Sequence, residues 1–224
     1  MRGKIIVIEG TDCSGKETQT SLLVQRLKRE GKKVERLRFP MYETPTGKIV
    51  GGPYLGKDYI TPCWFSEGAV NVDPKVAALY YAADRRYNLT TIESYLCDGY
   101  DLIIDRYVES NMAHQGCKIA DKEERLKLYK WLETLEYNLL ELPRPDLTIL
   151  LHMPYKKVVE LKRGRIGTDE HESSLSYLKT SEEAYLELAS MNNHQIIKCV
   201  NGDKLRDILD IHEEIYNIVN DKLG

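Results

Sequence analysis

The feature that most constrains the fold is a glycine-bounded loop near the start of the chain. Residues 10–16 read Gly-Thr-Asp-Cys-Ser-Gly-Lys, between the apolar run Ile5–Glu9 and the amphipathic segment Thr18–Arg29. A G-x-x-x-x-G-K loop between a strand and a helix surrounds a polyphosphate with backbone N–H groups, and its lysine reaches the outer phosphates. The loop therefore predicts a nucleoside triphosphate site. Its expected contact residues are Gly10, Thr11, Asp12, Cys13, Ser14, Gly15, Lys16, Glu17 and Thr18.

The residue after the lysine departs from the usual loop pattern. A serine or threonine hydroxyl normally binds Mg²⁺ there, whereas this chain has Glu17, with Thr18 displaced by one position. Two interpretations remain open. Glu17 holds the metal directly or through water, because a carboxylate suits a hard cation, or the match is an accidental Gly/Lys turn. The strand, loop and helix context favours the first interpretation.

Bulk properties favour a single domain that binds a small anionic ligand. The 224 residues suffice for one sizeable α/β core and are few for two, so we expect one domain over residues 1–224. A formal net charge of −3 gives no general attraction to nucleic acid or to an anionic membrane. The five cysteines contain no C-x-x-C pair, which favours reduced thiols in a cytoplasmic protein and no structural zinc site. No apolar run approaches the ~18 residues of a membrane span.

Short β-branched runs alternate along the chain with segments of helical period. The runs expected as buried strands are Ile5–Glu9, Val34–Phe39, Leu102–Asp105, Leu147–His152 and Gln195–Val200. The expected helices are Thr18–Arg29, Pro74–Leu96, Glu123–Leu142 and a C-terminal helix whose apolar stripe runs from Leu205 to Leu223. This alternation predicts an α/β fold of the P-loop NTPase type, a three-layer sandwich in which helices flank a five-stranded parallel sheet.

Two segments lack this regular pattern. Residues 45–74 mix Gly, Pro and aromatic residues without a sustained period, so a functional cover and a plain surface insertion are both open interpretations. Residues 162–173 are rich in charge and poor in apolar residues, and we expect a short lid that carries Arg163 and Arg165. A lid arginine can neutralise the charge that develops in phosphoryl transfer, whereas a solvated charged loop is the alternative.

An Asp-Arg pair and a helix arginine form the second half of the expected site. The apolar run 101–105 ends in Asp105-Arg106, and in a parallel sheet that end lies at the same edge as the loop after the first strand. Asp105 can help hold Mg²⁺ and Arg106 offers a planar fork to a phosphate, although a paired Asp/Arg at a sheet edge is the alternative. In the helix, Arg85 lies four residues after Tyr81 and shares its side, so an aromatic ring for a base and a guanidinium for a phosphate project together.

Taken in order, these motifs resemble the thymidylate kinase family, whose members phosphorylate dTMP with ATP. The most specific match is residues 105–116, D-R-Y-V-E-S-N-M-A-H-Q-G, which is similar to the family pattern D-R-Y-x-x-S-x-x-A-Y-Q-G. Arg38-Phe39-Pro40 and Ala83-Asp84-Arg85 match two further signatures. The resemblance spans nearly the whole chain. It implies transfer of the γ-phosphoryl group of ATP to dTMP for deoxynucleotide synthesis, with Mg²⁺, by a cytoplasmic homodimer.

The resemblance also implies roles for individual residues. The expected catalytic residues are Asp12, Lys16, Arg106, Arg163 and Arg165. The expected dTMP contacts are Asp12, Phe39, Tyr81, Arg85, Arg106, Ser110, His114 and Gln115, with Arg85 and Arg106 on the phosphate and Tyr81 stacked on thymine. Glu17 and Asp105 are the expected metal ligands. Cys13 occupies a P-loop position that is basic in one branch of the family, so the chain resembles the branch whose catalytic arginines come from the lid.

Departures from the family pattern keep alternatives open. His114 replaces an aromatic residue near the sugar, which leaves selectivity between deoxyribose and ribose open. A kinase for another nucleotide or for a deoxynucleoside would use the same P-loop and Asp-Arg pair, although two phosphate-facing arginines favour a monophosphate acceptor. The alternative from another class is a nucleotide-binding switch without turnover, and only Glu17 favours it.

Overall fold

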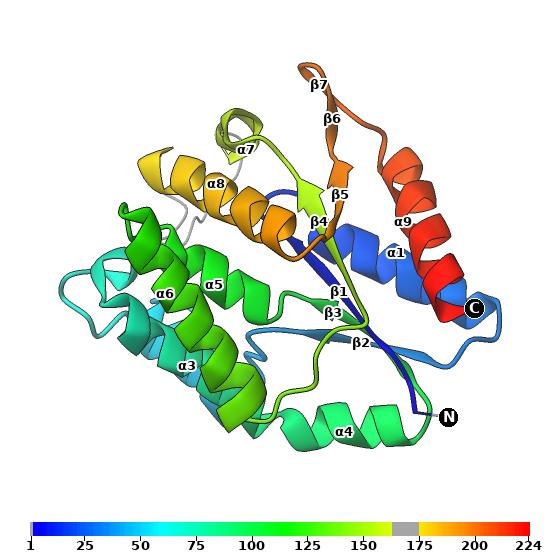
Figure 1. Cartoon of the computed structure of the whole chain (residues 1–224), viewed down its shortest axis with the longest axis horizontal. Helices are drawn as coiled ribbons and strands as arrows, with labels where there is room; N and C mark the ends of the chain where they lie inside the picture. The colour runs from blue at the N-terminus through cyan, green and yellow to red at the C-terminus, as the bar shows by residue number, and fades with distance from the viewer. Residues whose placement is uncertain (1, 163–174) are drawn as a thin grey trace.

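A five-stranded parallel sheet forms the centre of the protein (Figure 1). The computed structural model describes residues 2–162 and 175–224. The strand order is β2-β3-β1-β4-β5. The strands are β1 Ile5–Gly10, β2 Val34–Arg38, β3 Asp101–Asp105, β4 Leu147–His152 and β5 Gln195–Lys198. All four neighbouring pairs are parallel, which confirms the predicted fold class.

Helices cover both faces of the sheet, because successive strand residues point to opposite sides. One layer contains α3 Pro74–Tyr87, α4 Leu89–Cys97, α5 Val108–Gly116, α6 Lys122–Glu133 and α8 Leu175–Met191. The other layer contains α1 Lys16–Arg29 and α9 Ile208–Leu223, while α7 Tyr155–Lys162 lies beside α8 beyond the end of β4. Val7 and Ile104 point into the first core, and Ile6 and Ile8 into the second. The three-layer arrangement is therefore confirmed.

Three predicted helices have different bounds in the structure. The prediction of a single helix over 74–96 is wrong, since the chain turns at Asn88 between α3 and α4. The Asn88 side chain donates to the Asp84 carbonyl over 2.8 Å, and this local bond competes with helix continuation. The helix over 123–142 leaves the α-conformation after Glu133 and continues as the π-helical segment η3 Thr134–Leu139.

The C-terminal helix starts later than its apolar stripe suggests. Asp207 caps α9 by accepting a hydrogen bond from the backbone N–H of Leu209, so the helix begins at Ile208. Leu205 instead belongs to a two-stranded antiparallel pair, β6 Val200–Asn201 and β7 Lys204–Leu205. The strand predicted to reach Val200 therefore ends at Lys198.

The segment at 45–74 is more regular than the sequence suggests. It contains the short helix α2 Pro45–Ile49, the π-helical turn η1 Val50–Tyr54 and the 3-10 turn η2 Ala69–Asn71. Tyr54 is fully buried, and its ring centroid lies 5.7 Å from that of Tyr81 on α3. The segment is thus packed against α3.

None of the helices that the structure describes is long and apolar enough to span a membrane. All five cysteines are free thiols. Within residues 2–162 and 175–224, no group of three or more His, Cys, Asp and Glu side chains is placed to hold a metal ion.

Candidate active site

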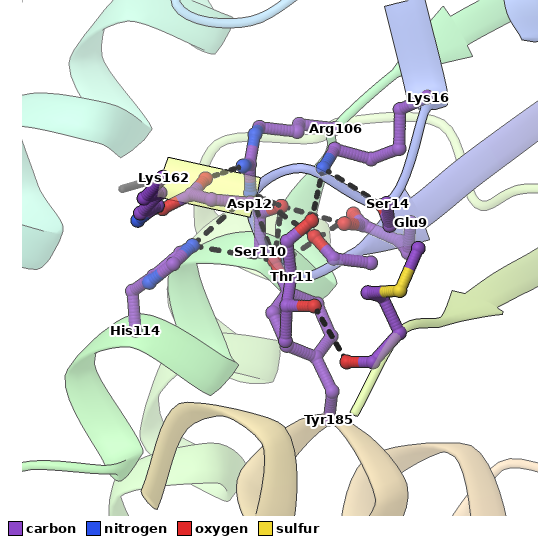
Figure 2. A network of polar contacts seen from close by, with 12 residues as sticks. Glu9, Thr11, Asp12, Ser14, Lys16, Arg106, Ser110, His114, Lys162 and Tyr185 are labelled. Carbon is purple, nitrogen blue, oxygen red and sulfur yellow. Dashed lines mark hydrogen bonds and ion pairs between the residues drawn. The ribbon is translucent and has the colours of Figure 1, made fainter. Parts of the chain in front are cut away.

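The phosphate loop follows β1 and requires glycine at its first position. A Cβ on Gly10 would lie 2.6 Å from the carbonyl oxygen of Leu151 on β4, so a larger residue would push the two strands apart. Gly15 has φ 84°, a left-handed backbone that glycine adopts without strain. Lys16 begins α1, and its Nζ donates to the Thr11 carbonyl over 2.7 Å and to Ser14 Oγ over 3.3 Å. The ammonium group therefore lies within the loop (Figure 2).

Electrostatics at the loop favour an anion. Burial and the neighbouring Arg106 guanidinium lower the pKa of Lys16 to about 8. The two cations destabilise each other, and a bound polyphosphate relieves that repulsion. Burial alone would raise the pKa of Asp12, but Arg106 and Lys16 hold it well below its usual range, so the carboxylate is ionised.

Arg106 connects the loop to the helix that follows β3 (Figure 2). It has φ 67°, and its Nη2 lies 2.5 Å from Asp12 Oδ1. Its Nη1 donates to Tyr185 Oη on α8 over 3.0 Å and contacts His114 Nε2 on α5 at 3.1 Å. Ser110 Oγ lies 3.4 Å from the same nitrogen. The guanidinium is thus held in a fixed plane beside the P-loop, where a planar fork can bind a phosphate.

Glu9 supports the site from behind and is not among the residues predicted from the sequence motifs. It is 1% exposed, and its carboxylate accepts hydrogen bonds from the backbone N–H groups of Tyr107 at 2.7 Å and Ser110 at 3.1 Å, and from Ser110 Oγ. Burial raises its pKa, although these bonds oppose the rise. A carboxylate in an otherwise apolar strand was the available signal. Glu9 fixes the start of α5 to β1, and with it the position of Arg106.

A pocket beside the P-loop brings together almost all of the expected dTMP contacts. It is lined by Asp12, Phe39, Pro40, Tyr42, Leu55, Tyr81, Arg85, Arg106, Ser110, Asn111 and His114. Gln115 is the exception, since its side chain is completely buried and does not line this pocket. Asn111, one turn earlier on α5, lines it instead. The expected contact between Gln115 and the base is therefore not supported by the geometry.

Arg85 enters the pocket as half of a buried ion pair. Its Nε and Nη2 both donate to the Glu136 carboxylate on η3, and the two side chains are 2% and 0% exposed. Asn111 Nδ2 donates to the same carboxylate over 2.8 Å. Asn111 Oδ1 is buried and has no hydrogen-bond partner among the described residues. Because Glu136 already neutralises Arg85, this geometry does not favour the phosphate contact expected of that arginine.

The two expected metal ligands lie near the P-loop in different surroundings. Asp105 is 8% exposed at the end of β3, and its Oδ2 lies 3.5 Å from Arg36 Nη2. Glu17 has a side chain that is 71% exposed and lies 3.6 Å from Arg38 Nη1. Protein-bound Mg²⁺ needs only one or two carboxylates in addition to substrate phosphates and water, so the donor chemistry suits Mg²⁺.

The expected lid lies mostly outside the described residues. Arg163 and Arg165 are both among residues 163–174. Lys162, at the end of α7, is described, and its Nζ lies 3.8 Å from Asp12 Oδ2. This lysine brings a further positive charge to the P-loop.

Comparison with known proteins assigns the family. A family model for thymidylate kinase matches residues 8–215. Human thymidylate kinase is 30% identical over 99% of this chain and 92% of its own length. A probable thymidylate kinase from Thermococcus onnurineus is 33% identical, with 97% and 98% covered. The solved structure of thymidylate kinase from Candida albicans has a TM-score of 0.77 at 25% identity, and covers 100% of this chain and 94% of that chain. The chain therefore belongs to the thymidylate kinase family.

Proposed function

We propose that this chain transfers the γ-phosphoryl group of ATP to dTMP, forming dTDP and ADP for deoxynucleotide synthesis. The observation that carries the proposal is the Asp12–Arg106 ion pair. It lies between the P-loop ammonium of Lys16 and the pocket beside α3. A donor triphosphate in the loop and a nucleoside monophosphate in the pocket would therefore meet at this pair.

The chemistry requires positioning and charge stabilisation rather than a covalent intermediate. Lys16 binds the donor phosphates, and Arg106 binds the acceptor phosphate for in-line attack. Asp12 stays ionised and orients the acceptor. As the γ-phosphoryl group moves, Lys16 and Arg106 stabilise the charge on its oxygens. Arg163 and Arg165 remain the arginines predicted from the sequence to assist this step.

The far end of the pocket suits a pyrimidine base. Tyr81 and Phe39 supply aromatic surface, Arg85 supplies donors, and Asn111 Oδ1 is an acceptor that no described residue engages. Thymine offers a carbonyl oxygen next to an N–H group, so a donor and an acceptor side by side match its edge. We therefore assign Arg85 to the base and Arg106 to the phosphate.

Mg²⁺ is the expected metal. Asp105 and Glu17 would hold it directly or through water, since both carboxylates lie next to the P-loop. An ion held by these two carboxylates would supply positive charge that offsets part of the charge on the substrate phosphates.

A homodimer in the cytoplasm completes the proposal. Val76, Leu79 and Tyr87 form one apolar stripe along α3, with exposed fractions of 42%, 49% and 56%. Such a stripe on the outside of a monomer fits a self-complementary contact with a second copy. The five free thiols are consistent with a reducing compartment.

The test is the initial rate of ADP formation with Mg·ATP and each of dTMP, dUMP, UMP, dCMP and thymidine, beside a control without acceptor. Turnover selective for dTMP is the expected result. Activity confined to another acceptor would keep the kinase and reassign the pocket. ATP binding without acceptor-dependent turnover would overturn the proposal in favour of a switch.

A further inference from the structure

His114 connects two helices to the P-loop arginine. Its Nε2 lies 3.1 Å from Arg106 Nη1, and its Nδ1 lies 2.6 Å from Tyr177 Oη near the start of α8. The rings of His114 and Tyr177 stack at 13°, with centroids 6.0 Å apart. Tyr185 Oη, also on α8, lies 3.3 Å from Nε2. The imidazole is therefore fixed through both of its nitrogen atoms.

Only one protonation state satisfies both contacts. A guanidinium has donors and no acceptor, so Nε2 must present its lone pair to Arg106. The ring proton then resides on Nδ1 and is donated to Tyr177 Oη. An imidazolium would direct an N–H group at the Arg106 N–H and lose that bond. Burial raises the pKa of the Tyr177 phenol well above its usual range. Tyr177 therefore remains a neutral hydroxyl, and its oxygen can accept the hydrogen bond from Nδ1–H.

We propose that His114 is a positioning residue, held as the Nδ1–H tautomer, through which Tyr177 of α8 sets the orientation of the Arg106 guanidinium. The Arg106 side chain can rotate about its single bonds, and the Nε2 contact acts with those from Asp12 and Tyr185 to fix which way the guanidinium plane faces. Tyr177 in turn defines the plane and tautomer of the imidazole. Replacing His114 or Tyr177 should therefore weaken the binding of the acceptor phosphate by Arg106, although neither residue needs to touch that phosphate.

Several charged and titratable groups face this network from the surrounding elements. Among the described residues they include Asp12 in the P-loop, Arg106 after β3, Cys117 at the C-terminal end of α5, Lys162 on α7, and Tyr177 and Tyr185 on α8. The Asp12 carboxylate favours a protonated imidazole, whereas the Arg106 and Lys162 cations oppose one. Lowering the pH should thus release the Arg106 contact when His114 becomes charged.

The first test is spectroscopic and does not depend on turnover. The ¹⁵N chemical shifts of the imidazole distinguish a protonated nitrogen from one with a free lone pair, and His114→Phe identifies the His114 signals. At neutral to slightly alkaline pH we expect a protonated Nδ1 and an unprotonated Nε2. The Nε2–H tautomer or an imidazolium would overturn the proposal, whatever the acceptor proves to be.

The second test is kinetic and rests on the proposed function. Tyr177→Phe removes one hydrogen bond and should lower kcat/KM for dTMP by about 2- to 12-fold. Tyr177→Phe should cause no further loss in a His114→Phe background, because the two residues act in series. His114→Gln can still accept from Arg106, and should recover much of the activity that His114→Phe loses.

A matched control separates this effect from a general loss of packing. Tyr129→Phe on α6 removes a hydroxyl that lies 3.3 Å from Glu187, which is on α8 like Tyr177. This contact is away from the pocket, so the variant should leave kcat/KM unchanged. Independent, multiplicative losses in the double variant would overturn the proposal. Inactivity of the wild-type protein toward dTMP would refute the proposed function alone, since the spectroscopic result would still decide the tautomer.

Discussion

Arg85 Nη2 lies 2.6 Å from Glu136 Oε1, in an ion pair between residues 51 positions apart that is almost completely removed from water. One partner is on α3 and the other on η3, so the pair joins two helical segments. The same pair holds the arginine at the wall of the pocket. With the base contact proposed for Arg85, stability and substrate binding would depend on one ion pair, and variants must be designed to separate them.

Removing Arg85 alone should strongly destabilise the fold. Arg85→Met would leave the Glu136 charge buried and unpaired, at a cost of about 3–5 kcal/mol in the free energy of unfolding. Arg85→Met combined with Glu136→Gln should recover most of that loss, because the amide still accepts from Asn111 and carries no charge. Urea unfolding measures both variants. A double variant as unstable as the single one would show that the ion pair is not the source of the effect.

The stable double variant isolates the role of Arg85 in binding. If this arginine reads the base, KM for dTMP should rise at least about tenfold, corresponding to about 1.4 kcal/mol, while KM for ATP stays unchanged. The measurement is steady-state kinetics with each substrate varied in turn. An unchanged KM for dTMP would remove Arg85 from the acceptor site.

ATP binding should take up a proton at Lys16. Its pKa of about 8 in the free protein leaves the amine mostly neutral at pH 9 and charged at pH 7. Bound phosphates favour the charged form, so uptake is expected at pH 9 and should be much smaller at pH 7. Calorimetry in two buffers of different ionisation enthalpy measures it. Lys16→Arg is the control, because a guanidinium stays protonated at both pH values. Equal apparent enthalpies in the two buffers at pH 9 would contradict the prediction.

Glu109 should make the fold less stable as the pH rises. This carboxyl is 7% exposed, and burial followed by the charge of Glu9 raises its pKa from 4.5 to about 7. Between these two pH values the folded chain binds more protons than the unfolded chain, so the free energy of unfolding falls as the pH increases. The full effect is on the order of 3 kcal/mol above pH 7.

Glu109→Gln removes this titration and should stabilise the protein. The gain over the wild type should be small at pH 5 and grow toward pH 8. Thermal or urea unfolding across that range measures it, with the exposed Glu123→Gln as the matched control. A gain that does not change with pH would mean that Glu109 is already ionised in the folded chain.

The Mg²⁺ dependence tests the two expected ligands separately. At fixed ATP, Asp105→Asn should raise the Mg²⁺ concentration needed for half-maximal rate, because a charged oxygen ligand becomes a neutral one. Glu17→Gln should do the same if its carboxylate leaves Arg38 for the metal. Glu123→Gln should have no effect. A normal Mg²⁺ requirement in Glu17→Gln would leave that residue as a surface ion-pair partner.

The α3 stripe predicts the oligomeric state. Leu79→Glu places a charge in the middle of the stripe and should convert a dimer of the full chain into a monomer, as measured by light scattering. Leu209→Glu is the matched control, since Leu209 is an exposed leucine on α9, away from the stripe, with an exposed fraction of 63%. A wild-type monomer would reject the dimer, and an unaffected dimer would place its interface elsewhere.

The parts of this protein that the sequence predicts are those set by short-range patterns. The alternation of apolar runs defines the sheet, and the spacing of glycine and lysine defines the loop. The helix break at Asn88 was not predicted, because it depends on side-chain bonds that compete with the backbone.

The surroundings of individual site residues were harder to predict. The partner of Arg85 is distant in sequence and lies on a π-helical turn, where the α-helical period no longer indicates which residue faces inward. On the regular helix α5, a motif match at Gln115 does not indicate that Asn111, one turn earlier, lines the pocket.

The close approach of Gly10 to the Leu151 carbonyl has a consequence for how the protein is made. The phosphate loop begins at Gly10, whereas β4, the strand that Gly10 packs against, comes some 140 residues later in the chain. A growing polypeptide on the ribosome therefore has its phosphate-binding sequence long before it has the strand that supports it. Until β4 docks, β1 lacks one of its two neighbours. Nucleotide binding should accordingly report that the second half of the sheet has assembled, and ATP should stabilise the chain only after that step.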